Sequence, residues 1–439
     1  MNFLVKKGNG LAGEISIPGD KSISHRSIIL ASLAEGSSRI YGLLEGEDCL
    51  ATIEVFKKMG VGISLKDGIC SVDGKGLEGL KEPDQVLDFG NSGTSVRLCA
   101  GLLSAQRFSS VLIGDESLST RPMQRIVDPL TSMGANISAS DKGTLPITIN
   151  SVKSLQSIEY SLPVASAQVK SCLMLAGLFA EGETRIKENV ITRDHTEKIF
   201  LEFGIPIEIF SEKTFKTICV NKIQRIEPKD IRVPGDFSSA SFFILAALIC
   251  PNSFLRLNNV GINDTRIGFL HALRNMGANI DLINQKDTPE PTADILVKTS
   301  VLQGITLDTA LVANMIDEMP AFFMAAALAE GMTIVKDAKE LRTKESDRLQ
   351  AMADSLNAFG ISYQLSDDGI VIHGIGSKGI LNSAEIDSYG DHRIAMASAI
   401  GSLRSDDEVR ISDCKNVNTS FPHFTNICKS VGIEINEYE

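Results

Sequence analysis

A short pattern recurs six times along this chain of 439 residues and limits what the chain can fold into. At each recurrence a helix-like segment ends in a bulky apolar residue and a glycine, and a strand-like segment follows. Glycine is the usual residue just past a helix, because it adopts a left-handed backbone without steric cost. Spacings of 74, 70, 73, 83 and 72 residues indicate six copies of one unit, with the glycines at Gly60, Gly134, Gly204, Gly277, Gly360 and Gly432.

A second landmark follows the same period. Runs of small and polar residues precede apolar helical segments such as ILASLAEG, MLAGLFAEG and MAAALAEG. Each unit is therefore predicted to run strand, helix, strand, helix, strand, with its first helix closely packed. Helix N-termini that come together would form an anion site, because their N–H groups have no partner within the helix. The charged residues that are able to do chemistry lie at or near these helix starts.

Two Pro-Gly-Asp tripeptides, at 18–20 and 234–236, predict the domain boundaries, because Pro followed by Gly marks a turn. Three units per half give two domains of ordinary size. We expect an N-terminal domain over 20–235 and a C-terminal domain formed by 1–19 together with 236–439. The two crossings imply that the first residues return to the C-terminal domain.

Composition narrows the class of protein. A hydrophobic content of 43% with 22% charged residues is ordinary for a soluble globular enzyme. The net charge of −12 argues against nucleic acid as a partner. No apolar run reaches the roughly 20 residues of a membrane span, and the segment MNFLVKKGNG lacks the apolar core of a signal peptide. The eight scattered cysteines favour buried free thiols. We expect a cytoplasmic protein.

In the N-terminal half, GDKSISHR over 19–26 comes close to a phosphate-binding loop of nucleotide enzymes, but Asp20 stands between Gly19 and Lys21. A phosphate loop without nucleotide specificity is predicted, although Ser at a helix start is also an ordinary cap. Other segments add arginines, which suit bidentate capture of carboxylate and phosphate. These segments are GNSGTSVR (90–97), RPM (121–123), SAQVKS (166–171) and TRDHTEK (192–198).

In the C-terminal half, Asp317 precedes a helix that starts with proline, and KESDRL over 344–349 mixes both charges within one turn. Taken alone, KESDRL is typical of surface ion pairs on a helix, and Asp391 in GDHR is typical of an N-cap. The spacing of His25, His195 and His392 matches no metal-ligand signature, so no metal is expected; the three lie far apart in the chain.

These motifs together resemble one family. GDKSISHR, GNSGTSVR, RPM, SAQVKS, TRDHTEK, GDFSSASFF, KESDRL and GDHR occur in the order found in 5-enolpyruvylshikimate-3-phosphate synthases, and SAQVKS with TRDHTEK resembles the class II bacterial form. The resemblance covers essentially the whole chain. It implies a two-domain, inverse α/β-barrel-like fold with six βαβαββ repeats, three per domain. It also implies a monomer that uses no cofactor and is inhibited by glyphosate.

The resemblance implies an activity and a role for individual residues. The family transfers the enolpyruvyl group of phosphoenolpyruvate to the 5-hydroxyl of shikimate 3-phosphate and releases phosphate. The implied catalytic residues are Asp317, Glu345 and Lys21. The residues implied to bind shikimate 3-phosphate are Lys21, Ser22, Arg26, Ser166, Ala167, Gln168, Arg193, Asp317 and Lys344. Those implied to bind phosphoenolpyruvate are Lys21, Gly93, Arg121, Gln168, Arg348 and Arg393, with Arg97 supporting that loop.

One departure and two alternatives accompany the resemblance. Some members of the family carry a lysine directly before the late segment at 419–422; here Lys415 is the nearest candidate. The sister family that acts on UDP-N-acetylglucosamine places Asn after the first Lys and usually a Cys before its loop arginine, whereas this chain has Ser22 and Thr120. An inactive, anion-binding relative would be expected to lose Asp317 or Glu345, and both are present.

Overall fold

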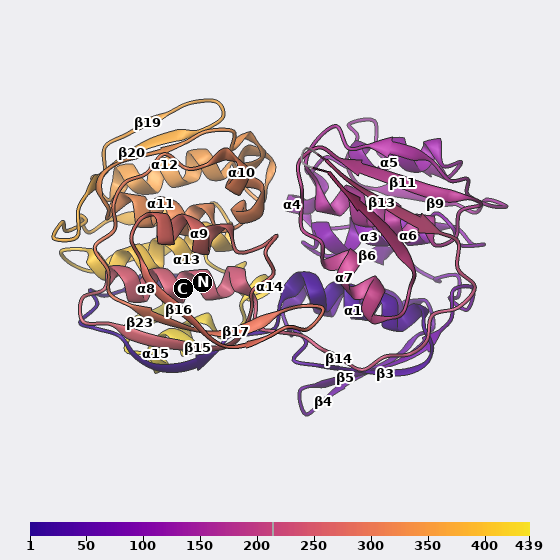
Figure 1. Ribbon diagram of the computed structural model, residues 1–439, viewed down its shortest axis with the longest axis horizontal. Coiled ribbons are helices and arrows are strands. Elements are labelled where there is room, and N and C mark those ends of the chain that lie inside the picture. Colours follow the sequence, from indigo (N-terminus) through magenta and orange to yellow (C-terminus); the bar gives the residue numbers. More distant parts are fainter. Residues whose placement is uncertain (213–214) are drawn as a thin grey trace. The chain divides into compact units, whose positions relative to one another are not determined.

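The computed structural model describes residues 1–212 and 215–439, and the chain divides into two compact units (Figure 1). The N-terminal unit comprises Gly19–Val233. The C-terminal unit comprises Met1–Pro18 and Pro234–Glu439, so the chain enters and leaves the N-terminal unit once each.

The N-terminal unit alternates helices and strands throughout. Its helices are α1 (Lys21–Leu33), α2 (Glu47–Lys58), α3 (Gly93–Leu103), α4 (Glu116–Ser119), α5 (Gln124–Ser132), α6 (Ala167–Gly177) and α7 (His195–Glu202). Its strands are β3 (Glu35–Tyr41), β4 (Gly62–Lys66), β5 (Ile69–Lys75), β6 (Leu87–Asp88), β7 (Ser110–Ile113), β8 (Asn136–Ser138), β9 (Ile147–Asn150), β10 (Glu159–Ser161), β11 (Glu183–Glu188), β12 (Ile207–Ser211), β13 (Lys216–Asn221) and β14 (Ile231–Arg232).

The C-terminal unit follows the same alternation. Its helices are α8 (Phe237–Ile249), α9 (Gly268–Asn275), α10 (Thr309–Val312), α11 (Met319–Ala327), α12 (Arg348–Ala358), α13 (His392–Gly401), α14 (Val417–Ser420) and α15 (Phe424–Ser430), with 3-10 turns at Ala313–Met315, Lys339–Thr343 and Ser402–Arg404. Its strands are β1 (Asn2–Val5), β2 (Ala12–Ser16), β15 (Phe254–Gly261), β16 (Asn279–Lys286), β17 (Thr292–Lys298), β18 (Glu330–Val335), β19 (Tyr363–Leu365), β20 (Ile370–Ile375), β21 (Glu385–Asp387), β22 (Val409–Ser412) and β23 (Ile435–Tyr438).

The three sheets of the N-terminal unit share one strand order. They run β14-β3-β5-β4, β6-β7-β9-β8 and β10-β11-β13-β12. In each sheet the first two strands are parallel and the other neighbours are antiparallel. A helix connects the parallel strands of the second and third sheets, which is the usual connection between parallel strands. The predicted α/β class with repeated units is the observed architecture.

The C-terminal unit also has three sheets among its described residues. Sheet β2-β15-β17-β16 has the same order, and in sheet β18-β20-β19 the first position is reduced to parallel bridges at Gln303 and Thr306. The third sheet, β21-β22-β1-β23, takes β1 from the beginning of the chain. The sixth repeat is therefore completed by the first residues of the protein.

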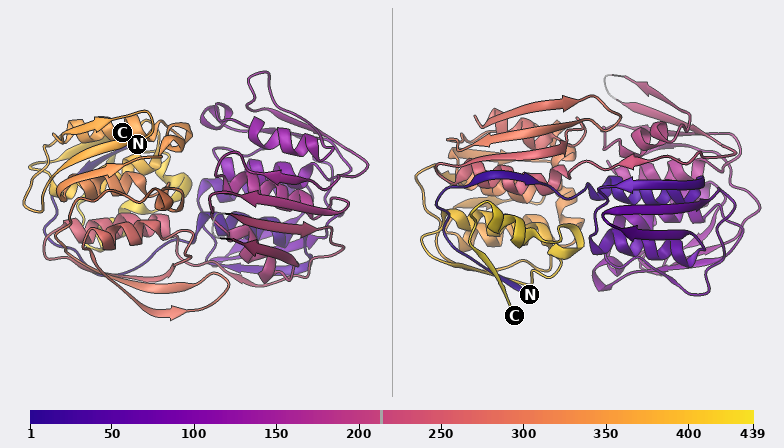
Figure 2. Two further views of the ribbon diagram at one scale, coloured as in Figure 1. Left: turned by 45° about the horizontal axis from the view of Figure 1, so that its top comes forward. Right: turned by 90° about the horizontal axis from the view of Figure 1, so that it is seen from below.

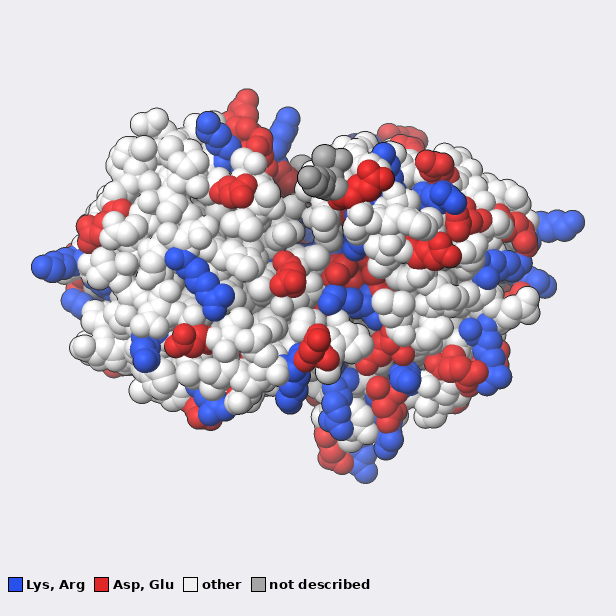
Figure 3. Space-filling model, in the orientation of Figure 1, with Lys and Arg blue, Asp and Glu red and all other residues white. Residues whose placement is uncertain are grey.

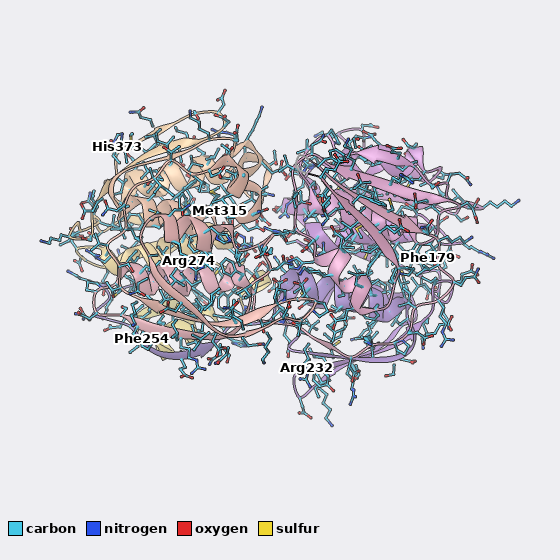
Figure 4. The ribbon with its side chains drawn as sticks, in the orientation of Figure 1. Phe179, Arg232, Phe254, Arg274, Met315 and His373 are labelled. Atoms are coloured by element: carbon cyan, nitrogen blue, oxygen red, sulfur yellow. The ribbon has the colours of Figure 1, made fainter. Side chains whose placement is uncertain are left out.

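The strands β2 and β14 are exchanged relative to the repeat. β2 directly precedes α1 in the chain but pairs with β15 of the C-terminal unit. β14 precedes α8 but pairs with β3 of the N-terminal unit. The guanidinium carbon of Arg232, a residue labelled in Figure 4, lies 4.7 Å from the centroid of the Tyr41 ring. The exchange places the two crossings after β2 and after β14, at the Pro-Gly-Asp tripeptides.

The core of each unit is built from the first helix of each repeat, with the sheets outside. Every residue of α8 is buried, and only the first two residues of α1 are not. Figure 2 shows the strands of each unit covering these helices. The packing is close: a methyl group placed on Gly101 of α3 would lie 2.1 Å from the carbonyl oxygen of Cys172 in α6. The small residues noted in the sequence are needed for this approach.

The six recurring glycines all have positive φ, from +71° at Gly204 to +95° at Gly432. Their predicted role as helix C-terminal caps is therefore confirmed. The helix starts also match the sequence pattern. Side chains of Asp20, Ser92, Ser166, Asp236 and Asp391 cap α1, α3, α6, α8 and α13, and α11 begins instead with Pro320 in its first turn.

The burial of the cysteines and the charges on the surface match what the composition predicted. All eight cysteines are buried. Acidic and basic side chains are interspersed on the face shown in Figure 3. Across residues 1–212 and 215–439, no helix combines the length and the apolar character needed to cross a membrane.

Candidate functional site

The start of α1 places Lys21 beside a buried carboxylate. Asp20 caps the helix by accepting a hydrogen bond from the backbone N–H of Ile23 at 2.9 Å. The ammonium of Lys21 lies 2.9 Å from Oδ2 of Asp48, at the start of α2, and the side chain of Asp48 is 7% exposed. Asp48 was not predicted from the sequence, because an acidic residue in the first turn of a helix is ordinary there. Only the tertiary contact identifies it.

Arg26 joins three helices of the N-terminal unit. Its Nε donates to Oγ1 of Thr196 in α7 at 2.7 Å, and its Nη2 donates to Oγ of Ser171 in α6 at 2.9 Å. Its Nη1 donates to the carbonyl of Ser22, one turn earlier in α1. These bonds to neutral acceptors fix the guanidinium in place. A fixed cation of this kind is suited to binding phosphate.

His25 connects α1 to the N-terminus of α3. Its Nδ1 lies 2.8 Å from Oγ1 of Thr52, and its Nε2 lies 3.3 Å from Oγ of Ser92, the N-cap of α3. Burial, followed by the charges of Lys21 and Arg26, lowers the pKa of His25 well below its usual range. The ring is therefore neutral near pH 7 and acts as a structural link. Its role as a link was not predicted from the sequence.

The GNSGTSVR, RPM and SAQVKS segments meet in the same unit. Arg97 in α3 donates to Oε1 of Gln168 in α6 at 2.6 Å and to the carbonyl of Pro122 at 3.1 Å. Arg121 donates to Oδ1 of Asn91 at 2.6 Å. Three segments separated by up to about 80 residues thus present their polar groups together, as the repeat predicted.

The remaining predicted residues of this unit lie at the same helix starts. Ser22 and Arg26 share the first turns of α1, and Arg193 lies two residues before α7. Ser166, Ala167 and Gln168 form the start of α6, where Oγ of Ser166 accepts from the N–H of Val169 at 3.3 Å. Side chains of Ser22, Ser166, Gln168 and Arg193 are all partly exposed and so are accessible to a ligand.

Arg348 organises the candidate residues of the C-terminal unit. Its guanidinium contacts Oδ1 of Asp317 at 3.1 Å, Oε2 of Glu345 at 2.5 Å and Oδ2 of Asp391 at 2.8 Å. Burial lowers the pKa of Arg348, but the three carboxylates outweigh it and raise that pKa, so the group stays charged. The side chain is 1% exposed, whereas those of Asp317 and Glu345 are 17% and 20% exposed.

Asp317 is held from two further sides. Its carbonyl accepts a hydrogen bond from Nη1 of Arg393 at 3.1 Å, and Nε of Arg393 lies 3.8 Å from its carboxylate. Met315, labelled in Figure 4, is fully buried two residues earlier and anchors the turn. The position of Asp317 is therefore fixed by backbone, charge and packing together.

Two expectations for single segments change in the structure. KESDRL is not a run of ion pairs along an exposed helix, because α12 begins only at Arg348 and that residue is buried. Asp391 is an N-cap, accepting from the N–H of Arg393 at 2.9 Å, but it also pairs with Arg348. A single sequence motif does not reveal this second role, because its partner is 43 residues away.

The two lysines of the C-terminal unit that were singled out from the sequence differ in position. Lys344 lies at the end of a 3-10 turn, with its ammonium 3.8 Å from Glu340. Burial lowers the pKa of Lys344 below its usual range, although nearby carboxylates such as Asp317 oppose the shift. Lys415 is exposed in the turn after β22. Among the residues that the structure describes, no group of three or more His, Cys, Asp and Glu side chains is arranged to hold a metal ion.

Comparison with known proteins gives one consistent result. The family model described as EPSP synthase (3-phosphoshikimate 1-carboxyvinyltransferase) matches residues 5–427. A 3-phosphoshikimate 1-carboxyvinyltransferase of Hydrogenovibrio crunogenus is 48% identical, covering 100% of this chain and 99% of the relative. One of Ruthia magnifica is 49% identical, covering 99% and 98%.

Solved structures agree with the sequence comparisons. An EPSP synthase from Acinetobacter baumannii has a TM-score of 0.88 and 45% identity, covering 99% of this chain and 100% of that one. The enolpyruvyl transferase NikO from Streptomyces tendae has a TM-score of 0.79 at 15% identity, covering 99% and 98%. At that identity the likeness shows the shared fold alone.

Proposed function

The chain belongs to the EPSP synthase family, as its motifs predicted, and we propose that it transfers the enolpyruvyl group of phosphoenolpyruvate to the 5-hydroxyl of shikimate 3-phosphate. The observation that carries the mechanism is the contact of Asp317 and Glu345 with one buried guanidinium, that of Arg348. Anion binding alone would not favour two partly exposed carboxylates in such a cluster. Carboxylates within reach of the reacting groups are typical of general acid–base catalysis.

The reaction is an addition followed by an elimination. The 5-hydroxyl oxygen bonds to the central carbon of phosphoenolpyruvate while a proton adds to its methylene carbon, giving a tetrahedral ketal. Loss of a methyl proton and cleavage of the C–O bond to phosphate then restore the double bond. Asp317 accepts the hydroxyl proton. Glu345 and Lys21 deliver and remove the proton at carbon, as the resemblance implies.

The fixed cations are proposed to bind both anionic substrates. Lys21, Ser22, Arg26, Ser166, Ala167, Gln168, Arg193, Asp317 and Lys344 are the proposed residues for shikimate 3-phosphate. Lys21, Gly93, Arg121, Gln168, Arg348 and Arg393 are those for phosphoenolpyruvate. What supports this assignment is that neutral acceptors hold Arg26 in place, as described above. Preorganised donors of this kind also stabilise charge that develops in the transition state.

Phosphate release tests the proposed function. The full chain is incubated with phosphoenolpyruvate and either shikimate 3-phosphate or UDP-N-acetylglucosamine. Release with shikimate 3-phosphate only is expected; release with the nucleotide sugar only, or with neither, would refute the proposal.

We further propose a cytoplasmic monomer that uses no cofactor and does not bind nucleic acid, as the resemblance and the charge imply. Light scattering with size exclusion checks the monomer.

The pH dependence of shikimate 3-phosphate binding tests the role of Lys344. A lysine whose pKa is lowered carries its charge below that pKa and loses it as pH rises through it. The phosphate of the ligand is already a dianion above about pH 7. As pH rises, affinity is therefore expected to fall at a lower pH than an ordinary lysine with a pKa near 10.4 would cause.

Calorimetric titration of the wild type and of Lys344→Arg measures this. The arginine stays charged throughout, so the affinity of the variant is expected to change less with pH, whatever its absolute value. Parallel pH curves for the two proteins would show that Lys344 does not contribute the titrating charge.

Gly93→Ala is expected to weaken inhibition by glyphosate, which we propose competes with phosphoenolpyruvate. A methyl group on Gly93 would lie 2.9 Å from Nη1 of Arg97 and 3.1 Å from Nη1 of Arg121. The methyl group would press on Arg121, which is proposed to bind phosphoenolpyruvate. The longer inhibitor would then have less room to adjust than phosphoenolpyruvate has. We expect the inhibition constant to rise about tenfold, or about 1.4 kcal/mol. Equal constants for wild type and variant would remove Gly93 from the proposed site.

A further inference from the structure

A buried ion network lies beneath the start of α6 in the N-terminal unit. The ammonium of Lys170, which is fully buried, is 3.0 Å from Oε2 of Glu188 and 2.8 Å from Oε1 of Glu197. Lys216 pairs with the same oxygen of Glu197 at 3.2 Å. The two positive charges of the lysines balance the two negative charges of the glutamates. None of these four residues is among the proposed ligand contacts. Burial of this many charges requires close pairing.

The charges in the network are retained despite burial. Burial lowers the pKa of Lys170, but Glu197 and Glu188 outweigh it and raise that pKa. Burial raises the pKa of Glu197, but Lys170 and Lys216 outweigh it and lower that pKa. The ammonium of Lys170 is fully buried beside the two glutamates. Its function has to be sought in what the network holds.

The network fastens the segments that carry the proposed shikimate 3-phosphate contacts. Lys170 lies in the first turn of α6, and its N–H donates to the carbonyl of Ser166, the N-cap, at 3.1 Å. Glu188 ends β11, and Glu197 lies in the first turn of α7. The segment between β11 and α7, 189–194, carries Arg193.

Thr192 is the link between the network and Arg193. Oε1 of Glu188 accepts a hydrogen bond from the N–H of Thr192 at 3.2 Å and another from its hydroxyl. Nζ of Lys170 lies 3.5 Å from the carbonyl of Thr192. The backbone is thus held on both sides of the residue that directly precedes Arg193.

We propose that Lys170, Glu188 and Thr192 are positioning residues that fix Arg193 for shikimate 3-phosphate before the ligand arrives. A loop ordered in advance binds more tightly, because binding no longer has to order it. The inference rests on the proposed function. It predicts that loosening Thr192 weakens binding of shikimate 3-phosphate in particular, with less effect on phosphoenolpyruvate.

The experiment uses Thr192, because removing Lys170 or Glu188 would leave a buried charge unpaired and endanger folding. Thr192→Val removes the hydroxyl with little change of shape, and Thr192→Ser restores it. Thr184→Val is the matched control: Thr184 lies on β11, is fully buried, and its hydroxyl has no hydrogen-bond partner among the described residues. Amide hydrogen exchange over 189–194 is measured on the free protein, and affinity for each substrate by calorimetry.

We expect Thr192→Val to exchange faster over 189–194 and to bind shikimate 3-phosphate about tenfold more weakly, corresponding to about one hydrogen bond to a charged group. Thr192→Ser and Thr184→Val should resemble the wild type. Unchanged exchange in Thr192→Val overturns the inference, and so does faster exchange with unchanged affinity. Wild-type protein that fails to bind shikimate 3-phosphate overturns the proposed function itself, which is a distinct result.

Discussion

Asp317→Ala is expected to lower kcat by about 10²–10⁴, the usual contribution of a positioned proton acceptor. The carboxylate is held by Arg348 and Arg393, so its position is set before substrate binds. Affinity for shikimate 3-phosphate should change far less than kcat, because several cations are proposed to hold that ligand. Steady-state kinetics with both substrates saturating measure the effect.

Two companion variants make the result specific. Asp317→Asn keeps a hydrogen-bond acceptor for Arg348 but cannot accept the proton, so its kcat should be nearly as low. Asp264→Ala changes an exposed carboxylate of the same unit and should retain wild-type turnover. If Asp317→Ala or Asp317→Asn turned over at near the wild-type rate, the assignment of the base would be wrong.

Gly101→Ala is expected to destabilise the N-terminal unit by about 3 kcal/mol, the upper part of the range for overpacked cores. The added methyl would lie 2.1 Å from the carbonyl oxygen of Cys172 and 2.9 Å from its carbon. These are backbone atoms of a neighbouring helix, so no side-chain rotation relieves the clash. A fall in Tm of about 2–4 °C per kcal/mol is expected, measured by circular dichroism.

Gly177→Ala is the matched control for this variant. Gly177 also lies in a core helix, α6, but its methyl would be 3.2 Å from its nearest neighbour, Cβ of Thr184, a contact that a shift of a few tenths of an ångström relieves. Alanine favours a helix over glycine by about 0.5–1 kcal/mol. The control should therefore unfold close to the wild-type temperature. Equal Tm values for Gly101→Ala and wild type would mean that α3 and α6 separate easily.

Much of the local structure could be predicted from the sequence. The glycine after each second helix adopts the left-handed backbone at Gly60, Gly134 and the four later positions. The small-polar runs start the core helices. These features depend on neighbouring residues only, so a single chain reveals them. Because the unit recurs six times, each local prediction applies at six places in the chain.

Long-range partners could not be predicted in the same way. Asp48 beside Lys21, the second role of Asp391 and the pairing of Lys170 with two glutamates all join residues from different elements. An acidic residue in a first helical turn carries no sign of which lysine or arginine it will meet. Asp317, Glu345 and Arg348 were named from the family resemblance, and their mutual contact became visible only in the structure.

The place of β1 in its sheet affects the order in which the protein can be completed as it is synthesised. All strands of the N-terminal unit have been made once Arg232 is added. Phe3, by contrast, pairs with Ile411 and Glu437, so β1 must remain without its partners until almost the whole chain exists. Pairings this distant are slow to form, and an unpaired strand is prone to aggregation. β1, although it precedes the other described strands in the chain, is therefore among the last strands to be incorporated into the fold.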